Sequence, residues 1–132
     1  PNGIGLSPDG STLYVAETQP GRVHHYAVTA PGEASPADLL GGTLLVGLPG
    51  MQLFDSLAID SEGNVCIATI VNGGITSISP DGETITHFAT PDLLTTNICF
   101  GGADLRTAFI TLSGTGKLIS TIWDVPGLRL NF

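Results

Sequence analysis

The chain has 132 residues, of which 42% are hydrophobic, so it is long enough for one domain with its own core. Twelve Asp and Glu residues against four Lys and Arg give a net charge of −8, which repels phosphate backbones and argues against a nucleic-acid partner. No apolar run reaches the roughly 18 residues of a membrane helix, so we expect no membrane partner. No signal peptide is visible, and the cellular location stays open.

The first third of the chain predicts short strands joined by tight turns. Its strands are expected at residues 4–6, 12–16, 22–29 and 42–48. The first two flank Ser7-Pro8-Asp9-Gly10, a turn with Pro at its second and Gly at its fourth position. Residues 30–38 are rich in Pro, Ala and acidic side chains, and we expect them to form a loop.

The rest of the chain repeats this plan. Further strands are expected at 56–59, 65–71, 74–79, 84–89, 97–100, 107–112 and 117–124. Asn72-Gly73 predicts a type I′ hairpin turn, in which both central residues need φ > 0. The closing residues 125–132 are irregular, and their apolar side chains should cover an edge or pack under a neighbouring element.

Three copies of one unit become visible when the turns are aligned. Leu6, Ile59 and Phe100 end the first strand of each copy, at offsets of 53 and 41 residues. Nothing has helical periodicity, and such periods are typical of β-propeller blades of four antiparallel strands. We expect an all-β fold of about three blades, near residues 1–50, 51–91 and 92–132. Because a propeller closes with roughly four to eight blades, the chain is part of a longer protein, or two chains assemble, or its edges are capped.

Polar residues recur where the first strand of each copy begins. Asn2 and Asp55 occupy this place, and Asn97 lies near it. The first strand of a propeller blade lines the central channel, so these side chains would face the channel mouth. Converging oxygen ligands suit Ca²⁺, which takes roughly six to eight oxygens. Ordinary turn residues are the alternative interpretation of the same pattern.

Other chemistry has less support in the sequence. Cys66 and Cys99 lie in predicted strands among apolar residues, and their spacing matches no C-x-x-C motif. We expect two buried free thiols. No G-x-S-x-G elbow is present, so nothing favours a serine-hydrolase triad.

Three segments and the closing residues together resemble a known family. They read PNGIGLSPDGSTLYVAET, FDSLAIDSEGNVCIAT, TNICFGGADLRTAFIT and PGLRLNF. In this order they resemble the C-terminal half of the senescence marker protein/gluconolactonase family, also called regucalcin-like. The resemblance implies half of a six-bladed propeller and a metal-dependent hydrolase of small lactones or esters. The implied cofactor is a divalent cation, Ca²⁺ first, with Zn²⁺ and Mg²⁺ as alternatives.

The resemblance also assigns roles to residues. It makes Asn2 a metal ligand and Asp55 both a metal ligand and the catalytic general base, while Asn97 lines the channel. Ser56 departs from the family pattern, which usually has Gly after the motif Asp. The family's ligand Glu and its substrate-binding Asn and Arg belong to the N-terminal half, outside this chain.

Two ligands do not make a metal site, and this leaves two hypotheses. In the first, a homodimer closes the ring about a twofold axis, so that Asn2 and Asp55 of both copies meet as a four-residue set. In the second, the chain is a non-catalytic binding or interaction module, or a remnant, without a working site.

Overall fold

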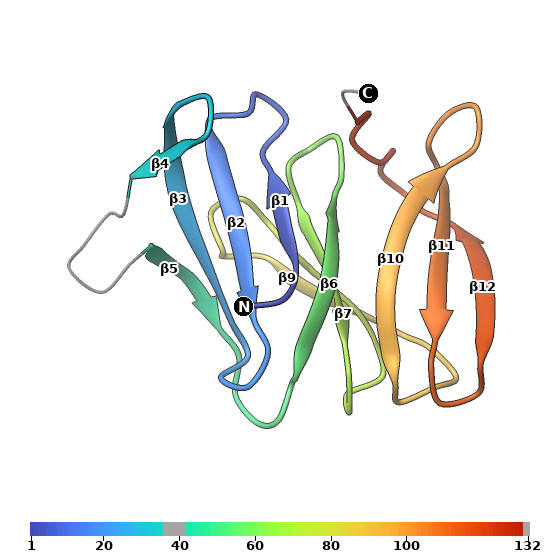
Figure 1. Ribbon diagram of the computed structural model, residues 1–132. Coiled ribbons are helices and arrows are strands. Elements are labelled where there is room, and N and C mark those ends of the chain that lie inside the picture. The colour runs from blue at the N-terminus through green and yellow to red at the C-terminus, as the bar shows by residue number, and fades with distance from the viewer. Residues whose placement is uncertain (36–41, 131–132) are drawn as a thin grey trace.

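The computed structural model describes residues 1–35 and 42–130 (Figure 1). In these ranges every regular element is a β-strand, and the strands form three antiparallel sheets that follow one another along the chain. The predicted all-β fold is therefore confirmed. Within the same ranges, no helix is long and apolar enough to cross a membrane.

The first sheet has five strands, one more than the predicted blade. They are β1 (Ile4–Leu6), β2 (Thr12–Glu17), β3 (Arg22–Ala30), β4 (Glu33–Ser35) and β5 (Thr43–Gly47). With nine residues, β3 is long enough to pair with β5 along its first half and with β4 along its second. The expected loop at 30–38 is thus wrong where β4 forms. Its residues 36–38 lie outside the described part of the chain.

The second sheet is a four-stranded blade, as predicted. It consists of β6 (Phe54–Ile59), β7 (Val65–Thr69), β8 (Gly74–Ile78) and β9 (Ile85–Ala89), in that order. The β7–β8 hairpin forms, but its turn is not type I′. The left-handed residues are Val71 (φ 75°) and Gly73 (φ 68°) instead of the pair Asn72-Gly73. Ile70 explains the difference. Its N–H donates to the carbonyl of Leu53 and it forms a β-bridge with Leu94, so it does not extend β7 and the connection to β8 has four residues.

The third sheet has three strands, as predicted. They are β10 (Thr95–Gly101), β11 (Thr107–Leu112) and β12 (Lys117–Ile122). The chain then crosses to the middle sheet instead of adding a fourth strand. Gly127 bridges Asp60, and the Leu128 N–H donates to the carbonyl of Ile59 at 3.0 Å. The expected packing of the closing residues is confirmed for Val125 and Leu128, which pack against the two cores, whereas Leu130 is exposed. Residues 131–132 lie outside the described residues.

Two apolar layers hold the sheets face to face. One layer joins the first and second sheets. Its buried residues are Tyr14, Ala16 and Val23 of the first sheet and Phe54, Ile59, Val65, Ile67 and Ile78 of the second. The other layer joins the second and third sheets through Cys66, Ala68, Ile75, Ile98, Ala108, Ile110, Leu112 and Trp123. This packing places β1, β6 and β10, the first strand of each sheet, side by side (Figure 1).

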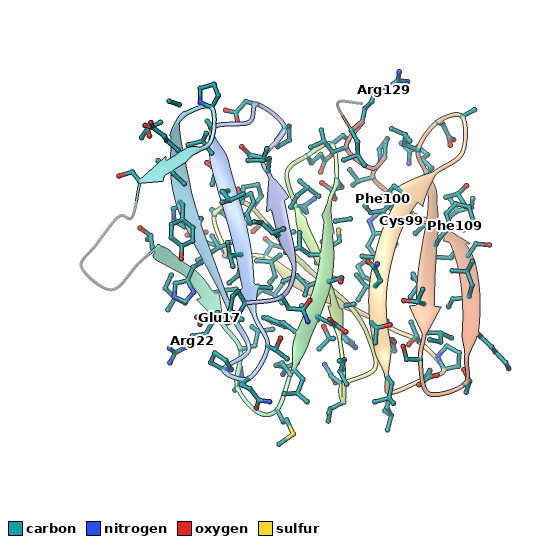
Figure 2. All side chains as sticks on the ribbon, in the orientation of Figure 1. Glu17, Arg22, Cys99, Phe100, Phe109 and Arg129 are labelled. Atoms are coloured by element: carbon teal, nitrogen blue, oxygen red, sulfur yellow. The ribbon has the colours of Figure 1, made fainter. Side chains whose placement is uncertain are left out.

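The two cysteines differ, which corrects the expectation that both are buried. Cys66 is buried between the second and third sheets, and burial raises the pKa of its thiol to about 12. Cys99 is exposed. Strand alternation explains this, because Ile98 and Phe100 pack against the middle sheet and turn Cys99 to the opposite face, where it pairs with Phe109 (Figure 2).

Candidate functional site at the start of the inner strands

Asn2 and Asp55 lie together, although 53 residues separate them in sequence. The Asn2 side-chain amide donates to Asp55 Oδ1 at 2.6 Å. Two backbone bonds hold the pair in place: the Asn2 N–H donates to the carbonyl of Ala16 at 2.8 Å, and the Gly3 N–H donates to the carbonyl of Asp55 at 3.1 Å. The pair is thus built where β1 and β6 begin.

Gly3 makes this close approach feasible. It is buried between the two inner strands, and a Cβ at this position would lie 2.7 Å from the Asp55 carbonyl oxygen and 2.9 Å from the Leu57 nitrogen. Backbone cannot move aside as a flexible side chain can. The glycine of the PNG segment therefore determines how near Asn2 comes to Asp55.

The pair offers donors of the right chemistry for a hard cation, but too few of them. Asn2 is exposed and Asp55 is half-buried, so their oxygens are within reach of solvent. Carboxylate and amide oxygens are the ligands that Ca²⁺ and Mg²⁺ prefer. In the described ranges, however, no three His, Cys, Asp or Glu side chains come together as a group able to hold a metal ion. The residues fit one side of a cation site, and the remaining ligands would have to come from outside the described residues.

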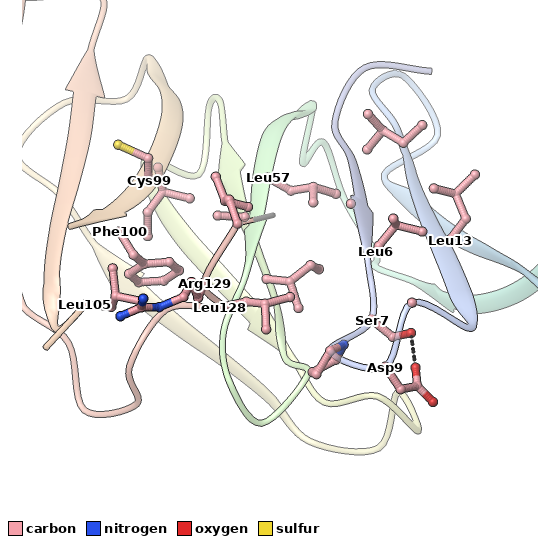
Figure 3. Close-up of a pocket in the computed structure, with 18 of the residues that line it drawn as sticks. Leu6, Ser7, Asp9, Leu13, Leu57, Cys99, Phe100, Leu105, Leu128 and Arg129 are labelled. Atoms are coloured by element: carbon pink, nitrogen blue, oxygen red, sulfur yellow. Dashed lines mark hydrogen bonds between the residues drawn. The ribbon is translucent and has the colours of Figure 1, made fainter. Parts of the chain in front are cut away.

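Asn97 is not part of the pair. It is exposed on β10 and lines a groove of about 1010 Å³ along the three inner strands. Most of the lining is apolar, from Leu6, Leu13, Leu57, Phe100, Leu105 and Leu128 (Figure 3). The groove covers β1, the second half of β6 and the closing segment, so it extends away from Asn2 and Asp55.

Asp9 gives the groove a negatively charged edge at neutral pH. Ser7 Oγ donates to its Oδ1 at 2.6 Å (Figure 3), and the backbone N–H and Oγ of Ser11 donate at 3.0 and 2.8 Å. These bonds, that of Ser7 first, lower the Asp9 pKa to about 2. The same Ser-Pro-Asp-Gly turn recurs in the middle sheet, where Ser79 donates to Asp81 at 2.5 Å and the Asp81 pKa is also lowered. The Ser–Asp bonds stabilise these two turns, and Asp9 does not contact the Asn2–Asp55 pair.

Sequence reasoning missed two strained residues beside the site. Leu53 (φ 47°) and Val71 (φ 75°) have a left-handed backbone conformation although neither is glycine. Leu53 stands two residues before Asp55, and its carbonyl accepts the Ile70 N–H at 3.2 Å. Neither residue type signals a left-handed backbone, so no sequence pattern could have revealed them.

The comparisons with known proteins agree with the architecture. A family model described as SMP-30/Gluconolactonase/LRE-like region matches residues 1–114. A 6-deoxy-6-sulfogluconolactonase from Pseudomonas putida is 30% identical over 125 residues, which are 95% of this chain and 42% of the relative.

Solved structures extend the likeness to the fold. A gluconolactonase from Xanthomonas campestris superposes with a TM-score of 0.70 and 26% identity, over 96% of this chain and 38% of that one. A regucalcin from Agrobacterium tumefaciens, described as a calcium-binding protein, superposes with a TM-score of 0.76 and 23% sequence identity. The match covers 98% of this chain and 49% of that one. The chain thus spans less than half the length of each of these proteins.

Proposed function

Because the chain belongs to the SMP-30/gluconolactonase/LRE-like family, we propose that it forms part of a metal-dependent hydrolase of small lactones or esters. The observation that carries this proposal is the Asn2–Asp55 pair, 2.6 Å apart where two inner strands begin. Relatives named as lactonases match nearly the whole chain. The three sheets, near residues 1–50, 51–91 and 92–132, are then three blades of one partial propeller domain.

Each residue of the pair has a role that its atoms can perform. Asn2 and Asp55 would hold a divalent cation, Ca²⁺ first, through an amide and a carboxylate oxygen. When bound, such a cation polarises a lactone carbonyl and lowers the pKa of a coordinated water. The Asp55 carboxylate is half-buried and one of its oxygens accepts from Asn2, which leaves the other able to orient the attacking water and accept its proton. Asn97, on the neighbouring inner strand, would line the substrate channel.

The missing ligands could come from a second copy of the chain. Both outer faces of the three-sheet stack expose large apolar side chains. Ile4, Leu6 and Leu44 lie on the free face of the first sheet, and Leu118 and Ile122 on that of the third. We propose that a homodimer joins the two faces, closes the ring and brings two Asn2–Asp55 pairs together. Static light scattering with and without Ca²⁺ tests this directly, and a mass of one chain at micromolar concentration would disprove it.

Hydrolysis and cation binding test the proposed function itself. We expect glucono-δ-lactone to be hydrolysed in the presence of Ca²⁺, followed by pH-stat titration, and Asp55→Ala to reduce kcat/KM at least a hundredfold because it removes both ligand and base. Glu83→Gln changes an exposed turn acid elsewhere in the middle sheet and should retain full activity.

Titration calorimetry with Ca²⁺ distinguishes the metal-site proposal from the alternative, a module without a working site. If Ca²⁺ binds to the wild-type chain and not to Asp55→Ala, the metal-site proposal stands. If the chain neither binds Ca²⁺ nor hydrolyses any lactone, the lactonase proposal is wrong and a non-catalytic binding or interaction module takes its place.

A further inference from the structure

Three connections at the site end of the molecule expose large apolar side chains. They are the β5–β6, β7–β8 and β9–β10 connections, which lie along the lower end in Figure 1. The residues are Met51 (66% exposed), Val71 (42%), Leu93 (65%) and Leu94 (43%), which we call the apolar rim. Loop tips of this kind are normally polar, so the rim calls for an explanation.

Hydrogen bonds join the rim into one surface. The Val71 N–H donates to the carbonyl of Leu93 at 2.8 Å, and Ile70 forms a β-bridge with Leu94. On the other side, the Asn72 side-chain amide donates to Gln52 Oε1 at 3.4 Å, beside Met51. The exposed side chains therefore belong to three loops that contact one another, and not to scattered surface positions.

The loops hold these side chains in a rigid frame. The buried carboxylate of Asp92 accepts from the Leu94 N–H at 2.8 Å and from the Thr115 N–H at 2.7 Å. Val71 keeps a left-handed backbone that β-branched residues avoid. Such strain persists only where surrounding bonds impose it, and it clusters at ligand-binding sites. These bonds fix the backbone from which Val71 and Leu94 project into solvent.

The rim is continuous with the Asn2–Asp55 pair. Phe54 pairs with Thr69 across β6 and β7, and the next bond along joins Leu53 to Ile70. Val71 therefore stands three strand positions beyond Asp55 on the neighbouring strand, or roughly 10 Å at the rise of a β-strand. A substrate whose lactone ring lies at Asp55 would have its substituent within reach of the rim.

We propose that the apolar rim binds the aliphatic substituent of the substrate, so that the preferred substrates are alkyl-substituted lactones. This rests on the proposed lactonase function. Burying an alkyl chain against the rim removes apolar surface of both from water, whereas the hydroxyl groups of a sugar lactone gain nothing there. An anionic membrane is a poorer match for the rim, because the chain carries a net charge of −8.

The test compares lactones that differ only in their substituent. We expect kcat/KM in the presence of Ca²⁺ to rise from γ-butyrolactone through γ-octalactone to γ-dodecalactone, and to be lowest for glucono-δ-lactone. Leu93→Ser should lower the ratio of γ-dodecalactone to γ-butyrolactone kcat/KM about tenfold, the scale on which apolar pockets discriminate. Ile85→Ser is the control, because Ile85 is an exposed apolar residue of outer strand β9 and lies outside the rim. It should leave the ratio unchanged.

Two outcomes separate this inference from the proposed function. If glucono-δ-lactone is the best substrate and Leu93→Ser leaves the ratio unchanged, the rim inference is overturned while the lactonase function stands. If no lactone is hydrolysed, the proposed function fails, and saturation-transfer NMR with γ-dodecalactone decides on the rim alone. Binding that Leu93→Ser abolishes and Ile85→Ser preserves would support it. The inference would be overturned if γ-dodecalactone does not bind. It would also be overturned if the wild-type chain binds phosphatidylcholine vesicles and Leu93→Ser abolishes that binding.

Discussion

Replacing Gly3 with Ala tests whether the close contact of β1 and β6 determines the site. The added Cβ would lie 2.7 Å from the Asp55 carbonyl oxygen, 2.9 Å from the Leu57 nitrogen and 2.9 Å from Leu57 Cγ. Two of these three atoms are backbone, so the strands must separate. Overpacking of this kind costs about 2 kcal/mol in the free energy of unfolding. At about 2.1 cal/mol/K of unfolding entropy per residue, this corresponds to a Tm lowered by about 7 °C.

Gly47→Ala is the matched control for this experiment. Gly47 is the last residue of β5 and, like Gly3, has no left-handed backbone; its nearest neighbour, Arg22 Cγ, would be 3.5 Å from an added Cβ. We expect this variant to be more stable than wild type by about 0.4–1 kcal/mol, because Ala restricts the unfolded chain. Urea unfolding followed by circular dichroism measures both variants. NMR spectra should also show a shifted Asn2 side-chain amide in Gly3→Ala only. Equal midpoints for Gly3→Ala and Gly47→Ala would refute the argument that glycine is required between the strands.

Two further predictions follow from the pKa shifts. Under native conditions at pH 8, Ellman's reagent should modify only Cys99, because Cys66 is buried and its thiol pKa is raised to about 12; rapid reaction of a native Cys99→Ser variant would contradict this. Asp9 has its folded pKa lowered from 3.8 to about 2, so its stabilising contribution is present above pH 4 and is lost as the pH falls from 4 through 2. NMR titration of the Asp9 carboxyl should give a midpoint near 2 that rises in Ser7→Ala, and a wild-type midpoint near 4 would show that the turn bonds do not persist in solution.

The sequence alone predicts the repeated unit and much of the fold. Alternating apolar residues and turn signals such as Ser7-Pro8-Asp9-Gly10 are local features, so they indicate strands and their connections without knowledge of the rest of the chain. The family resemblance singled out Asn2 and Asp55 for the same reason, because each belongs to a short motif. Their roles as ligands and base stay predictions until they are measured.

Other features depend on contacts that no local pattern encodes. The first sheet has a fifth strand only because both β4 and β5 pair along the long β3. The β7–β8 turn departs from type I′ because Ile70 bonds to Leu53 and Leu94, which are distant in sequence. Cys99 is exposed because, among the described residues, no further sheet covers its face.

Local sequence therefore determined which residues form strands, turns and site motifs, since backbone preference and side-chain alternation act over a few residues. Tertiary structure decided what those residues meet. The 2.6 Å Asn2–Asp55 contact, the strained backbone at Val71 and the apolar rim all arise where separate loops and strands pack and satisfy each other's hydrogen bonds. Such bonds join residues that are far apart in sequence, and for that reason only the folded chain shows them.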